Sequence, residues 1–315
     1  MKSSAKRKKH GMMKYYLVLP AAILLFCTTA LPVLYMIYTS FFRLDPVVFN
    51  REWPFVGLQN YATLLTQDPM FWSSLARTVK FLIYTVTPQL AVGLFLASFL
   101  YKEFKGKRIV QTTLMFPILA TPIIVAMIWK YFFDFDTGFL NVALRSLGLQ
   151  AQPWLSTKGL PMFANIPVVG EWLVRTFSLS YAFRTIVFIN FWQWTPFCFL
   201  IFYSGMTALP SEVYEAARID GATGWQVFRL ITLPLLKAVI FAVAFIRIID
   251  CLKVYAQIWV LFGNAEPTRV INIHLYTLGF TTSDYGTTSA LGVMLILMIA
   301  ALLFVSLKLG RRRDA

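Results

Sequence analysis

The sequence has little charge and few cysteine or histidine residues. Only 14% of its 315 residues are charged, whereas about 25% is usual for a soluble domain. Its two histidines and its three widely spaced cysteines fit neither a disulfide framework nor a metal site. No G-x-x-x-x-G-K-[ST] phosphate-binding loop occurs. We therefore expect no catalytic residue, no metal site and no cofactor in this chain.

Apolar residues dominate what is present, at 58% of the chain. Runs of about 20 apolar residues are long enough to cross a bilayer as helices. The first such run is too long for the core of a signal peptide, so we expect it to be retained. We predict an all-α polytopic membrane protein, with a basic segment 1–14, a transmembrane domain 15–308 and a basic tail 309–315. The six predicted transmembrane helices are 15–40, 76–100, 109–133, 181–208, 235–262 and 286–308.

The basic residues are unevenly distributed along the chain. Of the 29 Lys and Arg residues, 17 lie in four segments: the first fourteen residues, 101–108, 209–237 and the last eight residues. Eight of the 14 acidic residues lie in the loops between these segments. Clustering beside apolar runs is typical of membrane topology signals and argues against a nucleic-acid partner. The positive-inside rule then places both termini in the cytoplasm, which requires an even number of spans.

The predicted outward loop 134–180 is long. Its part "GEWLVRTFSLS" has two interpretations: a short interfacial helix with Trp172 and Phe177 at the lipid headgroups, or an irregular loop.

The predicted cytoplasmic loop 209–234 carries charged residues between two apolar spans. We expect Ser211 to cap a first helix that ends near Arg218 or Ile219. Asp220-Gly221 then forms a turn, and Thr223 caps a second short helix. Residue types alone leave two interpretations open: a knob that inserts into a cleft of a soluble partner, or an amphipathic connector on the lipid surface.

The stretch "EAARIDGATGWQVFRLITLPLL" in this loop resembles the EAA loop of bacterial ABC import permeases. The resemblance implies the type I ABC importer transmembrane fold and a loop that docks into an ATPase subunit. ATP and magnesium would then be bound by partner subunits. The residues assigned to this coupling loop are Glu215, Ala216, Ala217, Arg218, Asp220, Gly221, Ala222, Phe228 and Pro234.

Further segments resemble the carbohydrate branch of that family, the maltose- and glycerol-phosphate-type permeases. They are "FVGLQNYATLL" (55–65), the segment 189–217 and the segment 264–292. The sequence departs from the family pattern at the usual G-G-P turn, which is replaced by residues 263–267. The loop before the fourth span is also longer around 160–179, as a binding-protein contact or as a tolerated insertion.

The resemblance implies a set of partners in the cell (inner) membrane. They are a second, different permease subunit that forms a heterodimer with this chain, two ATPase subunits, and an extracytoplasmic binding protein. The binding protein would deliver a carbohydrate to the loops 134–180 and 264–285.

Polar and aromatic residues alternate at helical spacing in the fourth predicted span: Asn190, Gln193, Trp194 and Phe197. Polar residues within a membrane are costly unless they face a cavity or a partner, and amides beside aromatic faces suit sugars. The family resemblance places these four at substrate-lining positions. The alternative is that Trp192 and Trp194 belong to an interfacial aromatic belt.

The fifth span carries Arg247, Asp250, Cys251 and Val254, which the same resemblance places at the cavity. Arg247 and Asp250 are i, i+3 neighbours and can neutralise one another. Alternatively, Arg247 or Lys253 faces the cavity and selects an acidic oligosaccharide or a sugar phosphate.

Two other classes of function compete with the importer hypothesis. An ion-gradient-driven secondary transporter would use Asp250, but no internal repeat between the halves supports it. A membrane-embedded enzyme would need clustered catalytic residues, and one Asp and one Arg are weak support for that.

Overall fold

The computed structural model describes residues 18–44, 53–101, 104–158 and 180–311. These residues form helices, and their only β-pairing is an isolated bridge between Phe42 and Phe55. The elements are η1 (Phe26–Ala30), α2 (Leu31–Thr39), α3 (Gln59–Thr66), α4 (Pro69–Tyr101), α5 (Lys107–Leu119), α6 (Pro122–Phe132), α7 (Phe139–Ser146), α10 (Tyr181–Thr207), α11 (Ser211–Ile219), α12 (Gly224–Val227), η2 (Phe228–Thr232), α13 (Leu233–Leu235), α14 (Lys237–Leu252), α15 (Ala256–Phe262), η3 (Glu266–Thr268), α16 (Ile271–Tyr276), η4 (Thr277–Thr281) and α17 (Tyr285–Arg311).

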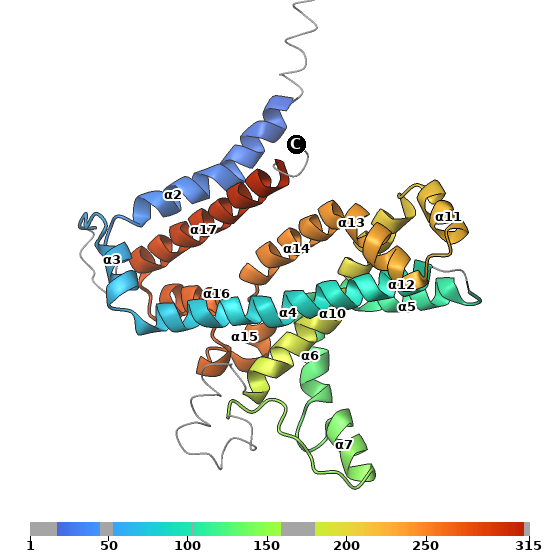
Figure 1. The fold of residues 1–315 in the computed structure, drawn as a ribbon. Coiled ribbons are helices and arrows are strands. Elements are labelled where there is room, and N and C mark those ends of the chain that lie inside the picture. Colours follow the sequence, from blue (N-terminus) through green and yellow to red (C-terminus); the bar gives the residue numbers. More distant parts are fainter. Residues whose placement is uncertain (1–17, 45–52, 102–103, 159–179, 312–315) are drawn as a thin grey trace, which may run out of the picture. The chain divides into compact units, whose positions relative to one another are not determined.

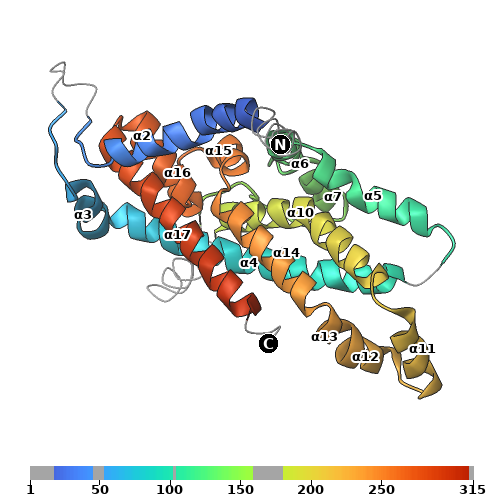
Figure 2. The same cartoon turned by 90° about the horizontal axis from the view of Figure 1, so that it is seen from above.

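The chain forms two compact units. The first comprises Met1–Pro69 and Leu275–Leu302, and the second comprises Met70–His274 and Leu303–Ala315. Within the first unit, the C-terminal end of the helix Val18–Thr39 meets α17 (Figure 1), and Figure 2 shows that the two helices diverge from there. The Thr39 hydroxyl donates a hydrogen bond to Ser289 Oγ over 2.9 Å.

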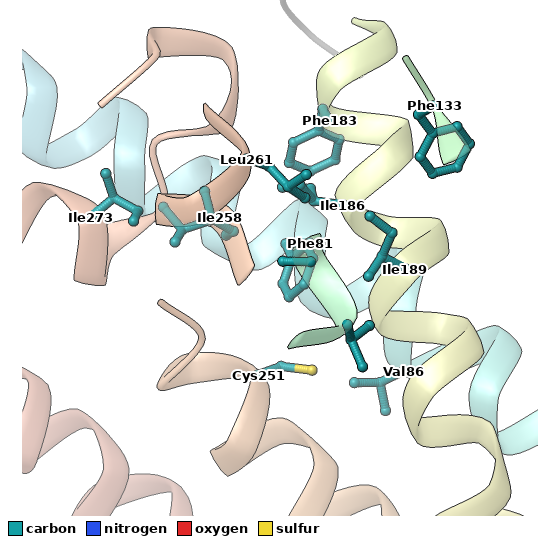
Figure 3. Packing of buried hydrophobic residues seen from close by; sticks show 13 residues of the cluster. Phe81, Val86, Phe133, Phe183, Ile186, Ile189, Cys251, Ile258, Leu261 and Ile273 are labelled. Atoms are coloured by element: carbon teal, nitrogen blue, oxygen red, sulfur yellow. The ribbon is translucent and has the colours of Figure 1, made fainter. Parts of the chain in front are cut away.

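The second unit is organised around the long helices α4 and α10. Both confirm predicted spans, and α10 continues without interruption through Pro196. The core lies where these helices meet α6 and α15, and Figure 3 shows Phe81 of α4 among side chains of α10 and α15. The Phe81 and Phe183 rings meet edge to face with centroids 6.4 Å apart. Since lipid is as apolar as these side chains, close packing rather than the hydrophobic effect holds such helices together.

The predicted spans 109–133 and 235–262 are not continuous helices. The first is divided into α5 and α6, which meet at an angle of 100°. Its break is explained by Pro122, which has no amide hydrogen and restricts the preceding Thr121 to the extended conformation that it adopts, with ψ of 149°. The second is divided into α14 and α15 around residues 253–255. With 16 residues, α14 is shorter than the roughly 20 needed to span a bilayer.

Four helices of the described residues are long and apolar enough to span a membrane, or five if the bent pair α5–α6 is one span. The four are Val18–Thr39, Pro69–Tyr101, Tyr181–Thr207 and Tyr285–Ser306. The count of six therefore stays a prediction. The basic segment 1–14, the residues 312–315 and the segment 160–179, with Trp172 and Phe177, lie outside the described residues.

Residues 134–158, the described part of the loop that is predicted to face outward, are organised by the buried side chain of Asn141. Its amide donates to the carbonyl oxygens of Phe135 and Gln152, over 3.2 and 3.0 Å, and its oxygen accepts from Trp154 Nε1 over 3.0 Å. At the start of this segment, the backbone amide and hydroxyl of Thr137 hold the pKa of Asp134 below its usual range. A compact hydrogen-bonded segment therefore follows α6.

Candidate functional site

The predicted coupling loop folds as two short helices joined by a turn. The first, α11, ends at Ile219 as predicted, but the predicted cap by Ser211 is wrong. Pro210 occupies the N-cap position in an extended conformation without a side-chain cap, so Ser211 is already the first helical residue. Gly221 has a φ of +73°, a left-handed conformation that glycine adopts without strain, and this confirms the predicted turn.

The second helix of the loop, α12, begins with a capping box. The Thr223 hydroxyl accepts from the Gln226 amide over 3.4 Å, and the Gln226 side chain accepts from the Thr223 amide over 2.7 Å. This confirms Thr223 as the cap. Reciprocal caps of this kind satisfy amide groups at the helix start that have no partner within the helix.

The coupling-loop residues divide into a buried and an exposed set. Ala217 is buried, and its carbonyl accepts from the Ala222 amide over 3.0 Å, which closes the loop. Glu215 and Arg218 are exposed on α11. The sequence analysis missed three large apolar side chains that are 66–86% exposed here: Ile219, Trp225 and Leu230. Large apolar side chains in a charged loop are a sequence signal for a surface that binds a partner.

A pocket of about 410 Å³ opens in the second unit beside the two helix breaks. Predicted residues from α10 and α14 line it, together with Lys253 and the start of α15. Its lining residues are Pro122, Asn190, Trp194, Arg247, Asp250, Lys253, Val254, Tyr255, Ala256 and Gln257.

Arg247 is buried, with a relative accessibility of 1%, and protein groups occupy its guanidinium. Nε donates to Gln89 Oε1 over 3.1 Å, and Nη2 donates to Asn190 Oδ1 over 3.2 Å. Nη1 pairs with Asp250 over 3.3 Å, which confirms the predicted neutralisation. The guanidinium also lies over the ring of Trp194, 4.7 Å from its centroid, as a cation–π contact.

Lys253 is the exposed cation of the pocket. Its side chain is 60% exposed, and its ammonium lies 3.7 Å from the second oxygen of Asp250. The Asp250 side chain, 37% exposed, thus lies between a buried and an exposed cation.

The structure brings together most of the predicted pathway residues, but not all of them at the pocket. Gln193 is buried and donates to the Ala120 carbonyl over 2.9 Å. Cys251 is buried against Arg247. The Phe197 and Trp194 rings pack in a T-shaped pair, with centroids 6.3 Å apart.

Two functional candidates were missed by the sequence analysis. Gln89 is fully buried in α4 and accepts from Arg247, and Gln257 is buried in the first turn of α15. Both are amides within predicted spans, so the argument applied to Asn190 would also have found them.

The sequence of this chain is similar to those of known permease proteins. Over 314 residues the chain is 32% identical to the trehalose/maltose transport system permease protein MalF of Thermococcus litoralis, covering 99% of this chain and 98% of that one. It is 30% identical over 284 residues to the arabinooligosaccharides transport system permease protein AraP of Bacillus subtilis, covering 89% and 82%.

The fold has solved counterparts. A chain of a bacterial ABC transporter involved in the import of the acidic polysaccharide alginate matches with a TM-score of 0.79 and 23% identity, and the match covers 98% of each chain. This likeness confirms the predicted all-α ABC importer permease fold. Residues 89–314 match the family model described as binding-protein-dependent transport system inner membrane component. Since that match covers most of the chain, the protein belongs to this family of inner membrane transport components.

Proposed function

We propose that this chain is the membrane-spanning permease subunit of an ATP-driven importer, and that it passes a carbohydrate through the pocket between α10 and α14. The observation that supports a carbohydrate substrate is the lining of that pocket. It presents the aromatic side chain of Trp194 beside the charged groups of Asp250 and Lys253, and aromatic and polar groups together suit the apolar and hydroxyl-bearing sides of a sugar ring. Related permeases whose names state trehalose, maltose or arabinooligosaccharide transport support the same cargo class.

The ATPase activity belongs, in this proposal, to two partner subunits that bind ATP and magnesium. The exposed Glu215 and Arg218 and the exposed apolar Ile219 and Trp225 form a surface on which such a subunit can dock. A heterodimeric second permease and an extracytoplasmic binding protein complete the proposed assembly. Both termini of this chain then face the cytoplasm, and the segment 134–158 faces the binding protein.

An anionic saccharide remains part of the proposal, and Lys253 is the favoured one of the two cations, Arg247 and Lys253, that were expected to select it. Arg247 does not offer a free guanidinium, because Gln89, Asn190 and Asp250 already engage all three of its nitrogens. Lys253 takes this role, because its ammonium is exposed at the pocket. An ion-driven carrier that uses Asp250 gains no support, since two cations flank that carboxylate.

The experiment that tests the function begins with a tagged chain extracted gently from its native membrane. Mass spectrometry of the co-purifying proteins is expected to find an ABC ATPase and a second permease. The binding protein of the system is then screened against neutral and acidic oligosaccharides, and the best ligand is offered to vesicles with ATP inside. A chain recovered alone that transports without ATP would contradict the proposal.

A further inference from the structure

The buried polar side chains around Arg247 form a hydrogen-bond chain that runs in one direction. Arg247 donates to Asn190 Oδ1, and Asn190 Nδ2 donates to Gln257 Oε1 over 3.1 Å. Gln257 Nε2 donates to Gln193 Oε1, and Gln193 Nε2 donates to the backbone carbonyl of Ala120 over 2.9 Å. We name the three side chains between Arg247 and Ala120 the amide relay.

The two ends of the amide relay fix its direction. An arginine side chain has only donors, and a backbone carbonyl has only acceptors. Each primary amide between them accepts at its oxygen and donates at its nitrogen, so a rotated amide would oppose donor to donor or acceptor to acceptor. The three amides are 1–3% exposed, so such a mismatch would leave buried polar groups unpaired at a cost in free energy. Arg247 at one end and the Ala120 carbonyl at the other therefore determine together how the three amides point.

The amide relay joins the two places where predicted spans are broken. Ala120 is the C-cap of α5, and its carbonyl is one of those that a helix end leaves without an intrahelical partner. Gln257 lies in the first turn of α15, directly after the other break. The side chains of α10 stand between the two and contact both.

Gln89 adds further hydrogen bonds at the Arg247 end of the amide relay. Gln89 of α4 accepts from Arg247 Nε and donates both to the Asn190 carbonyl, over 2.9 Å, and to Asn190 Oδ1, over 3.2 Å. Asn190 Oδ1 is thus held by two donors that come from two different helices. Its amide nitrogen is left to point toward Gln257.

We infer that Arg247 is a positioning residue: through the amide relay it holds the bend between α5 and α6 in register with the break between α14 and α15. The two breaks flank the pocket, so their relative position sets its shape. This role concerns the proposed transport pocket, but it requires no cargo to be bound.

The test measures the bend directly in the assembled complex in lipid nanodiscs, without added saccharide. Cys27, the exposed cysteine of the described residues, is replaced by serine, and spin labels are attached to Ile109→Cys and Tyr131→Cys. These exposed positions lie near the far ends of α5 and α6, so their distance reports the bend. We expect a narrow distance distribution in the parent chain. Arg247→Gln, which brings both a donor and an acceptor, is expected to broaden it.

Two further variants test the pathway from Arg247 to Ala120. Gln193→Met removes the last link without touching Arg247 and is expected to broaden the distribution in the same way. Asp250→Asn changes a contact of Arg247 outside the amide relay, and the distance distribution is expected to stay narrow in this variant. A narrow distribution in Gln193→Met overturns the inference, even where Arg247→Gln does not assemble.

The control for general loosening of the core is Ile189→Ala, a fully buried position of α10 outside the amide relay. It is expected to lower the thermal stability without broadening the distribution. Equal broadening in this variant would show that the distance reports lost packing, and would overturn the inference. Because no cargo is used, failure here leaves the proposed import function untouched, and failure to find a transported sugar leaves this inference untouched.

Discussion

The backbone of Gly93 in α4 passes so close to α10 that a β-carbon on residue 93 would lie 2.7 Å from the Cys198 Cβ and 3.0 Å from the Phe199 amide nitrogen. Real β-carbons do not approach other atoms this closely, so a side chain here must push the helices apart. Close approach at small residues is a main source of attraction between helices in lipid.

Gly93→Val is therefore expected to destabilise the second unit by about 1–3 kcal/mol, the usual cost of overpacking. The measurement is the thermal unfolding midpoint of the purified complex. Gly224→Ala is the matched control, because a β-carbon there meets no atom within 4 Å. An unchanged midpoint in Gly93→Val would contradict the close packing of α4 and α10.

Lys253→Gln is expected to reduce transport of an acidic saccharide selectively. Removing one charged hydrogen-bond donor costs about 1.4 kcal/mol, which corresponds to a roughly tenfold higher KM. The measurement is ATP-dependent uptake into vesicles of one acidic and one neutral saccharide that the system accepts. A control is Lys130→Gln, a cation of α6 that does not line the pocket. Equal loss for both saccharides would show that Lys253 does not select charge.

Glu215→Lys is expected to abolish coupling between ATP hydrolysis and uptake while the chain still inserts into the membrane. The carboxylate is exposed on α11, where a reversed charge disturbs docking but no internal contact. Uptake and ATPase rate are measured together on the reconstituted complex. Glu212→Lys, on the first turn of the same helix, is the matched control. Normal uptake by Glu215→Lys would refute the docking role.

Thr223→Ala is expected to loosen the second helix of the coupling loop. Loss of an N-cap hydroxyl costs about 1 kcal/mol, so amides within α12 should exchange their hydrogens roughly fivefold faster. Hydrogen exchange followed by mass spectrometry measures this. Thr223→Ser keeps the hydroxyl and should exchange like the parent chain. Unaltered exchange in Thr223→Ala would mean that the capping box contributes little.

Asn141→Leu is expected to disorder the segment 134–158 and leave the membrane helices intact. Its loss leaves the part-buried amide and carbonyl of Gln152 without their Asn141 partner, at up to about 1–3 kcal/mol each. We expect faster hydrogen exchange at 150–156 and weaker binding of the extracytoplasmic binding protein, with α4 and α10 unaffected. Gln150→Ala, an exposed position next to the segment's hydrogen bonds, serves as the control. A parent-like exchange pattern would show that Asn141 is dispensable.

The course of the membrane helices was predictable to different degrees. Long apolar runs gave the helices Val18–Thr39, α4, α10 and α17 to within a few residues at most ends, since hydropathy alone determines them. The break before Pro122 has a local signal, because proline restricts the residue that precedes it. The break at residues 253–255 carries neither glycine nor proline, and tertiary packing decides it.

For the site as well, local sequence predicted some features, and others depend on tertiary packing. A polar residue in an apolar span must find a partner or a cavity, and this argument correctly singled out Asn190, Gln193 and Arg247. It did not distinguish which of them would be enclosed. That depends on Gln89 and Gln257, which come from other helices, and one helix read alone contains no information about its neighbours.

The exposed apolar side chains of the coupling loop, Ile219, Trp225 and Leu230, also bear on how the complex is assembled. If this chain is made in excess of its proposed ATPase partner, the unpartnered copies would leave three large apolar side chains exposed to the cytosol. Chaperones and proteases act on such surfaces, and binding to a partner removes them by mass action. The abundance of this subunit in the membrane should therefore follow the supply of its proposed partner, so that the surface proposed for docking would also set the number of complexes.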